Sequence, residues 1–206
     1  MAKIKNTKTE LKAQTDALKR FQRFLPMLQL KKQQLQMEIA GITASIDTLS
    51  EKEEAWRASL SSWIALFGTD DIPPAFITRT AVLTDTGNIA GVAIPIYKGV
   101  ETRRAPVDLL ATPPWLDDAG DALAQALAFD AEREVLEEQR RLINEELRTT
   151  SQRVNLFEKV KIPECKENIR VIRIHLGDES TAAVARGKIA KRRSAAPADD
   201  EGEAAE

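Results

Sequence analysis

Apolar residues recur along the first third of the chain with the spacing of a helix that packs against another long helix. Alternating steps of three and four residues from Ile4 to Phe67 pass through nineteen positions, of which fifteen are apolar. A period of 3.5 residues over this length is typical of the seam of a left-handed coiled coil. The sequence therefore predicts a coiled-coil helix over residues 1–67. Its expected seam residues are Leu18, Phe21, Leu25, Leu28, Leu35, Ile39, Ile42 and Ile46.

Residues 121–185 carry a second, less regular seam. Its apolar positions change phase by one residue near Pro163, which lacks a backbone N–H and crowds the preceding turn. We expect a kink or local bulge at Pro163 and another kink at Pro26 in the first helix. Cys165 falls on this seam, so packing explains it better than a reactive thiol does. The expected seam residues here are Val154, Phe157, Ile162, Ile169 and Ile172.

An antiparallel pairing of these two segments predicts a register. If Phe67 lies opposite Asp121, the numbers of paired residues sum to about 188. Pro26 would then face about residue 162, next to Pro163. We therefore expect both helices to bend at the same level.

Residues 68–120 separate the helical segments and hold eleven of the 18 Gly and Pro residues. Phe76–Thr84 is rich in β-branched residues, Asp85–Asn88 has turn chemistry, and residues 89–94 form the expected returning strand. Pro95 should end the ladder or mark a sheet edge.

A single hairpin is marginal by itself. We expect this one to rest on the helix ends that carry Trp56 and Trp63, whose rings core packing explains. The predicted fold is mainly α, a long antiparallel two-helix coiled coil with a small β-hairpin insert at its distal end. Residues 186–206 should form a basic, then acidic, disordered tail.

The net charge of the chain is only −2, but basic and acidic residues are concentrated in different segments. Residues 1–32 hold nine basic and two acidic residues (+7), and residues 153–193 hold eleven and five (+6). Residues 33–152 hold ten basic and twenty acidic residues (−10), and five acids without a base follow from residue 194. Because opposite fields select and steer partners, a basic and an acidic end should meet different partners. A solvated helical surface is the simpler alternative.

Candidate chemistry is sparse. One histidine, His175, and one cysteine are too few for a Cys/His zinc site, and we expect neither to belong to a Ser-His-Asp or Cys-His constellation. Gly177 and Gly187 have the wrong spacing for a P-loop, and no apolar run approaches the ~18 residues of a membrane-spanning helix. We expect no catalytic residues, no cofactor, no metal, no direct membrane insertion and a cytoplasmic protein.

Several motifs resemble one family. Arg153–Glu158, Ile162-Pro163 and Glu167–Ile172 resemble the C-terminal helix signature of the D subunit of V-type (vacuolar/archaeal-type) ATPases. Ala90–Pro95 resembles the short Gly-Val-x-x-Pro segment of its insert, and Leu28–Leu35 is similar to its N-terminal helix.

This resemblance implies a central rotor stalk, a non-catalytic subunit that couples ATP hydrolysis or synthesis to proton or sodium transport by rotation. The implied partners are the A and B subunits of the catalytic ring, the F subunit, and a membrane-side socket subunit, with the chain peripheral to the membrane. The basic end would enter the ring and the acidic end would face the membrane-side parts. The candidate contacts to the ring are Lys3, Lys5, Lys8, Lys12, Arg170 and Arg173.

Two alternatives remain open. The chain could be a coiled-coil adaptor outside any motor. It could also be a coiled coil that binds nucleic acid through the basic run Arg186–Arg193, although this run lacks interleaved aromatic residues. We expect no nucleic-acid partner.

Overall fold

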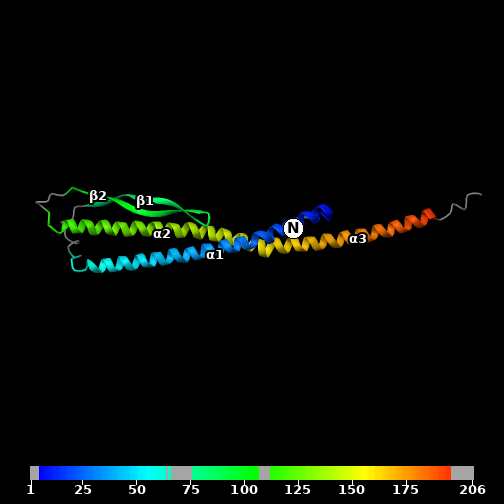
Figure 1. The fold of residues 1–206 in the computed structure, drawn as a ribbon, viewed down its shortest axis with the longest axis horizontal. Helices are drawn as coiled ribbons and strands as arrows, with labels where there is room; N and C mark the ends of the chain where they lie inside the picture. Colours follow the sequence, from blue (N-terminus) through cyan, green and yellow to red (C-terminus); the bar gives the residue numbers. More distant parts are fainter. Residues whose placement is uncertain (1–4, 64, 66–75, 107–111, 196–206) are drawn as a thin grey trace, which may run out of the picture. The chain divides into compact units, whose positions relative to one another are not determined.

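The computed structural model describes residues 5–63, 65, 76–106 and 112–195. Its elements are α1 (Lys8–Ser59), β1 (Ile77–Ile89), β2 (Val92–Arg104), α2 (Leu116–Leu156), the π-helical turn η2 (Phe157–Lys161) and α3 (Ile162–Ala195) (Figure 1). Long helices on either side of a two-stranded antiparallel hairpin confirm the predicted fold class.

The chain divides into two compact units. The terminal unit joins Met1–Met27 to Arg153–Glu206, and the insert unit is Leu28–Gln152. The charge segregation follows this division closely, since the two basic segments belong mainly to the terminal unit and the acidic segment to the insert unit.

Helix α1 begins where Thr7 accepts a hydrogen bond from the backbone N–H of Glu10 (3.2 Å) on its side-chain oxygen. It continues through Pro26 and ends at Ser59, eight residues before the predicted boundary. Leu60, Ser61 and Trp63 then donate backbone hydrogen bonds three residues back, as in a tightened last turn. Serine side chains compete for backbone hydrogen bonds, which helps to end the helix in this Ser-rich stretch.

In the terminal unit, the first half of α1 packs antiparallel to η2 and α3. The Phe21 and Phe157 ring centroids are 5.0 Å apart, and Asn168 Nδ2 lies 3.5 Å from Gln14 Oε1. The predicted register would instead place Phe21 opposite residue 167 and Gln14 opposite residue 174. That register is therefore wrong by about one seven-residue repeat. The apolar pattern cannot distinguish the two registers, because a seam that repeats every seven residues keeps the same faces together when one helix slides by one repeat.

The prediction that both helices bend at the same level, at Pro26 and Pro163, is also wrong, because it depended on the predicted register. Pro26 comes five residues after Phe21, and Pro163 comes six residues after Phe157. Because the helices run in opposite directions, the two prolines lie on opposite sides of the Phe21–Phe157 contact. Their separation along the axis is about 16 Å, or about three helical turns.

The bulge expected near Pro163 is confirmed. The five residues Phe157–Lys161 form a π-helical turn, closed by a hydrogen bond from the Ile162 N–H to the Phe157 carbonyl. The turn takes up one extra residue, so Val154 and Ile169 are both buried although they are fifteen residues apart, one more than two seven-residue repeats. Pro163 has no N–H for the ladder and crowds the turn before it, which favours a wider turn at this place.

In the insert unit, α1 packs against α2. The fully buried Leu35 and Ile143 belong to one cluster with Ile42 and Ile94, so both helices and strand β2 contribute to this core. Farther along α1, the centroid of the Trp56 ring lies 5.5 Å from the centroid of the Phe129 ring on α2, as core packing predicts.

The hairpin turn lies later in the chain than predicted. Ala90 and Gly91 both have positive φ (52° and 84°), which defines a tight two-residue turn, and Asn88 Oδ1 accepts the Gly91 N–H at 3.0 Å. Asp85–Asn88 therefore lies inside β1, paired with residues 93–96. This register places Ile94 in the core, with Ile89, Ala90 and Val92 around it. Burial of these apolar side chains outweighs the local turn chemistry of Asp85–Asn88.

The hairpin lies along α2 and reaches well beyond the helix ends on which we expected it to rest (Figure 1). Pro95 does not end the ladder: it pairs with Thr86 within β2. Its carbonyl accepts a hydrogen bond from Gln139 Nε2 on α2 at 2.5 Å. Both strands of a two-stranded sheet are edges, where a proline is tolerated.

Candidate functional site

The predicted seam residues all lie on inward-facing surfaces of their units. Their functional role stays a prediction. Leu35, Ile42, Val154, Ile169 and Ile172 are buried. Leu18, Phe21, Leu25, Leu28, Ile39, Ile46, Phe157 and Ile162 are half-buried. Cys165 is buried as well, and this burial raises the pKa of its thiol, with a smaller contribution from Glu164. A neutral, buried thiol suits packing rather than nucleophilic chemistry.

A buried carboxylate interrupts the seam in the insert unit. Glu53 is only 6% exposed, and its two oxygens pair with Arg133 of α2 and with Arg57 one turn later on α1 (2.5 Å). The sequence pattern shows an acid at a seam position but does not reveal its partner, because Arg133 belongs to the other helix. This ion pair joins α1 to α2 and favours one register, since sliding either helix would remove one of the two charged partners of a buried carboxylate.

A second interhelical ion pair lies nearer the core cluster. Lys31 Nζ on α1 lies 2.6 Å from Glu146 Oε1 on α2, and both side chains are partly shielded. Together with the Glu53–Arg133 pair, it connects the two helices at both ends of the insert unit's apolar seam. Arrangements of this kind resist both sliding and rotation of one helix against the other.

Ion pairs also attach the hairpin to α2. Arg79 of β1 pairs with Glu134 (2.7 Å), and Arg104 at the end of β2 pairs with Asp121 (2.6 Å). Arg104 also lies over the Phe76 ring, 5.8 Å from its centroid. These exposed contacts are individually weak, so the apolar tip around Ile94 contributes most to holding the hairpin in place.

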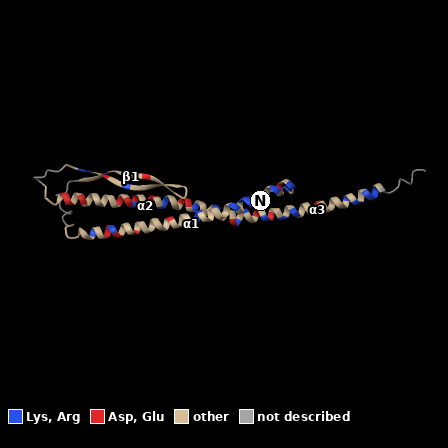
Figure 2. Cartoon of the chain, in the orientation of Figure 1, with Lys and Arg blue, Asp and Glu red and all other residues tan. Residues whose placement is uncertain are grey.

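The candidate contacts to the ring are exposed cations of the terminal unit. Lys5, Lys8, Lys12, Arg170 and Arg173 are all exposed, and Lys3 lies outside the described residues. Arg170 pairs with Glu167 on its own helix (2.6 Å), and this hydrogen bond lowers the pKa of Glu167. Figure 2 shows Lys and Arg side by side on the first turns of α1 and on α3.

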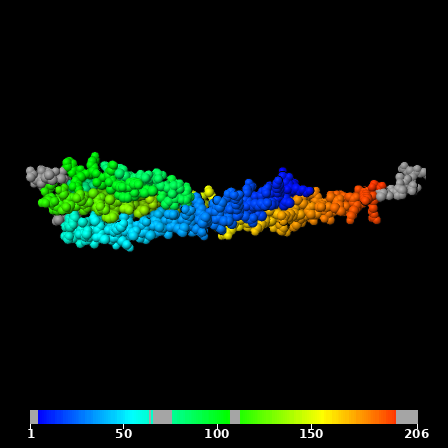
Figure 3. Space-filling model, in the orientation of Figure 1, coloured from blue at the N-terminus to red at the C-terminus, as the bar shows by residue number. Residues whose placement is uncertain are grey.

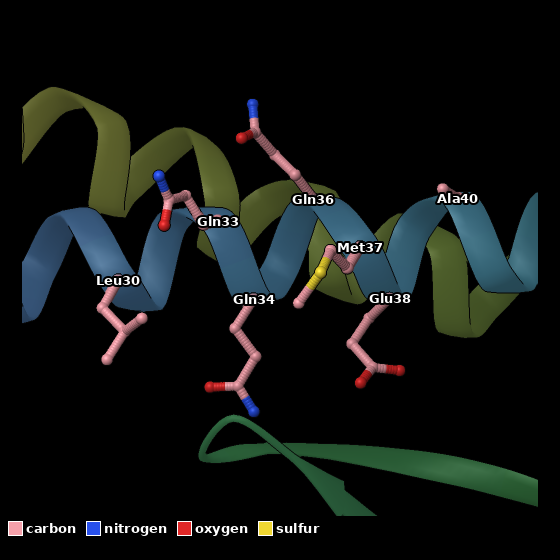
Figure 4. A pocket seen from close by; sticks show the side chains of 7 residues that line it. All are labelled: Leu30, Gln33, Gln34, Gln36, Met37, Glu38 and Ala40. Atoms are coloured by element: carbon pink, nitrogen blue, oxygen red, sulfur yellow. The ribbon is translucent and has the colours of Figure 1, made fainter.

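Two shallow grooves lie along helices of the insert unit. One follows α1 and is lined by Leu30, Gln33, Gln34, Gln36, Met37, Glu38 and Ala40 (Figure 4). In this view Gln33 and Gln36 point to one side of the helix, and Leu30, Gln34 and Glu38 point to the other. The lining contains no nucleophile beside a base. Another groove follows α2 and is lined by Glu134, Glu137, Glu138, Arg140 and Arg141.

Among the described residues, no group of three or more His, Cys, Asp or Glu side chains could hold a metal ion. The described helices include none with the length and apolar character needed to cross a bilayer.

Comparison with known proteins agrees with the motifs in the two helices and the hairpin. The family model described as the ATP synthase D subunit matches residues 10–192. The V-type ATP synthase D subunit of Borreliella burgdorferi is 48% identical over 191 residues, which cover 93% of this chain and 95% of the relative. The proteins of that name from Chlamydia caviae and Chlamydia muridarum are 32% and 34% identical, with 93% of this chain and 94% and 96% of the relatives covered. The chain therefore belongs to the family of V-type ATP synthase D subunits, the central-stalk subunits of these rotary complexes.

Proposed function

We propose that this chain is the non-catalytic shaft of a V-type rotary ATPase and transmits torque between the catalytic A/B ring and the ion-carrying membrane ring. Its rotation would couple ATP hydrolysis or synthesis to the transport of protons or sodium ions. The complex would hold it on the cytoplasmic side, peripheral to the membrane, with the F subunit and a socket subunit as further partners.

The observation that carries this proposal is the locked pairing of helices within each unit. A shaft must not let one helix slide on the other under load. In the insert unit, the Leu35–Ile143 core and the Glu53–Arg133 ion pair oppose sliding. In the terminal unit, the Phe21–Phe157 contact and the buried Ile172 do the same.

Charge supports an orientation for the shaft. The terminal unit carries the exposed cations Lys5, Lys8 and Lys12 on α1 and Arg173 on α3. The insert unit contains the acidic segment, residues 33–152, with ten basic and twenty acidic residues. We infer that the basic unit enters the catalytic ring, and that the acidic unit faces the socket subunit and the membrane.

Removal of the chain from its host tests the function. Membranes without it should retain a catalytic A/B ring that hydrolyses ATP but should lose ATP-driven ion uptake, and the tagged chain should restore uptake and co-purify with A and B subunits. If the tagged chain captures neither of them, it is an adaptor outside the motor and the proposal fails.

Charge variants test the orientation. We expect K5Q/K8Q/K12Q to weaken binding to the A/B ring, with the largest loss at low salt where surface charges are least screened. The matched control K52Q/R103Q/R148Q removes three exposed cations from the insert unit. Equal losses in both variants would contradict entry of the basic unit into the ring.

A further inference from the structure

The C-terminal part of α3 has no packing partner within its own unit. From residue 177 to residue 194 every side chain is exposed except that of Ala182, which is half-buried. The apolar side chains Val184 and Ile189 are 57% and 54% exposed. Figures 1 and 3 show this segment, orange to red, running past the first turns of α1. An isolated helix of this length is marginal in water.

This helix ends in a dense group of cations. Residues 186–193 hold five bases and no acid: Arg186, Lys188, Lys191, Arg192 and Arg193. Lys188, Lys191 and Arg192 are spaced three and four residues apart, so they share one face and repel one another. Within the described part of the chain, none of the five takes part in an ion pair. Among the described residues, no acidic side chain neutralises the positive surface at the end of α3.

The residues that follow have the complementary composition. Residues 196–206 lie outside the described part of the chain and hold five acids and no base: Asp199, Asp200, Glu201, Glu203 and Glu206. Helix α3 ends at Ala195, two residues before Pro197, which cannot donate within a helix and disfavours a helical residue before it.

The chain is long enough for its acids to reach the cations. Arg186 lies nine residues before Ala195, which is about 14 Å along a helix. Eleven residues after Ala195 can span up to about 36 Å. The direct connection also keeps the local concentration of acidic groups high, in the millimolar range typical of short tethers.

We propose that residues 196–206 bind back onto the basic face of residues 186–193 and cover it. An anionic surface of a partner must then displace this acidic segment before it can bind the end of α3. A polyanion that binds by charge alone must compete with the acidic segment for the same cations. A partner that makes additional contacts can displace the acidic segment, because the exposed ion pairs of that segment are individually weak. The inference does not depend on the proposed role in a rotary motor.

Zero-length carbodiimide cross-linking of the full chain tests the contact directly. We expect Lys188 or Lys191 to be joined to carboxylates of residues 199–206, at low salt and within one chain, as judged from a mixture of isotopically light and heavy protein. The exposed pair Lys161–Glu164, with its atoms 3.1 Å apart, is the internal positive control. If only the control pair is joined, or if the tail links occur between chains, the proposal is overturned.

Binding of a fluorescent oligo-dT of twenty nucleotides, a polyanion probe, tests the consequence. The variant D199N/D200N/E201Q/E203Q/E206Q should bind about five- to tenfold more tightly than the natural chain at 50 mM NaCl, and this gain should vanish near 0.5 M. The control D47N/E51Q/E54Q/D118N/E137Q changes net charge equally by removing exposed acids of the insert unit. It should bind less than about twofold more tightly. Equal gains in both variants would overturn the proposal.

Discussion

The ring of Phe21 on α1 lies 5.0 Å from the ring of Phe157, the first residue of the π-helical turn. This contact fixes the pairing of the terminal unit at the place where the second seam changes phase. The same residue, Phe157, therefore sets the register of the two helices and begins the π-helical turn that Pro163 favours.

Truncation of this aromatic pair should weaken the fold measurably. We expect F21A and F157A each to lower the free energy of unfolding by about 2 kcal/mol, below the usual 3–5 kcal/mol because both rings are only half-buried. A double-mutant cycle in urea should give a coupling of about 0.5–1.5 kcal/mol. The control F24A, whose ring is 48% exposed, should cost less than about 1 kcal/mol. Additive losses would contradict a direct contact.

The π-helical turn should tolerate loss of one residue. Deletion of the exposed Val160, combined with P163A, should convert Phe157–Lys161 into ordinary α-helix and keep Cys165 and the later seam residues inward, because the turn holds one residue in excess. We expect the urea midpoint to change little. Deletion of the exposed Lys166 should instead rotate Ile169 and Ile172 outward by about 100° and destabilise the unit by several kcal/mol. Similar midpoints for both deletions would refute this account.

The buried carboxylate of Glu53 should matter more than its exposed neighbour. E53Q should lower the free energy of unfolding by about 1–2 kcal/mol, since it removes a charged partner from both Arg57 and Arg133, which are partly exposed. E54Q, one residue away and exposed, should be neutral. The swap E53R/R133E should recover part of the loss in thermal unfolding, and no recovery would mean that the pair does not set the register.

Two glycines should respond to alanine with opposite signs. Gly91 has φ of +84° at the hairpin turn, so G91A should destabilise by about 1 kcal/mol although a Cβ would meet open space. Gly41 lies inside α1, and a Cβ there also meets nothing within 4 Å. G41A should stabilise by about 0.5–1 kcal/mol through helix propensity. Urea titrations of both variants measure the difference, and equal signs would contradict the turn geometry.

The thiol of Cys165 should resist ionisation and chemical modification at alkaline pH in the folded protein. Because burial raises its pKa, the thiol stays protonated in the folded state at pH values where it ionises in the unfolded chain. This contribution to stability is present below the unfolded pKa and is lost as pH rises towards the folded one. Reaction with a disulfide reagent at pH 9 should be slow in the native protein and fast in urea. C165A should abolish the reaction and flatten the alkaline decline, and fast native labelling would show that the thiol is accessible.

Local pattern was enough to predict the helices, the inserted hairpin and the bulge near Pro163. These features depend on residues that lie close in sequence: a 3.5-residue apolar period, β-branched runs, and a proline beside a phase change. The candidate ring contacts also come from sequence, as cations on predicted helical surfaces. The partners of Glu53 and Arg79 were not predictable, because each pairs with a residue far along the chain.

By itself, the sequence determined which residues face inward and that charge is segregated, since side-chain period and composition are local properties of the chain. Only the tertiary structure decided the register of Phe21 on Phe157, the turn at Ala90 and Gly91, and the path of the hairpin along α2. A heptad seam looks the same after a slide of one repeat, and several short turns are locally acceptable. The choice among them depends on which long-range contacts bury Ile94 and pair Glu53, and those contacts exist only once the helices and hairpin have come together.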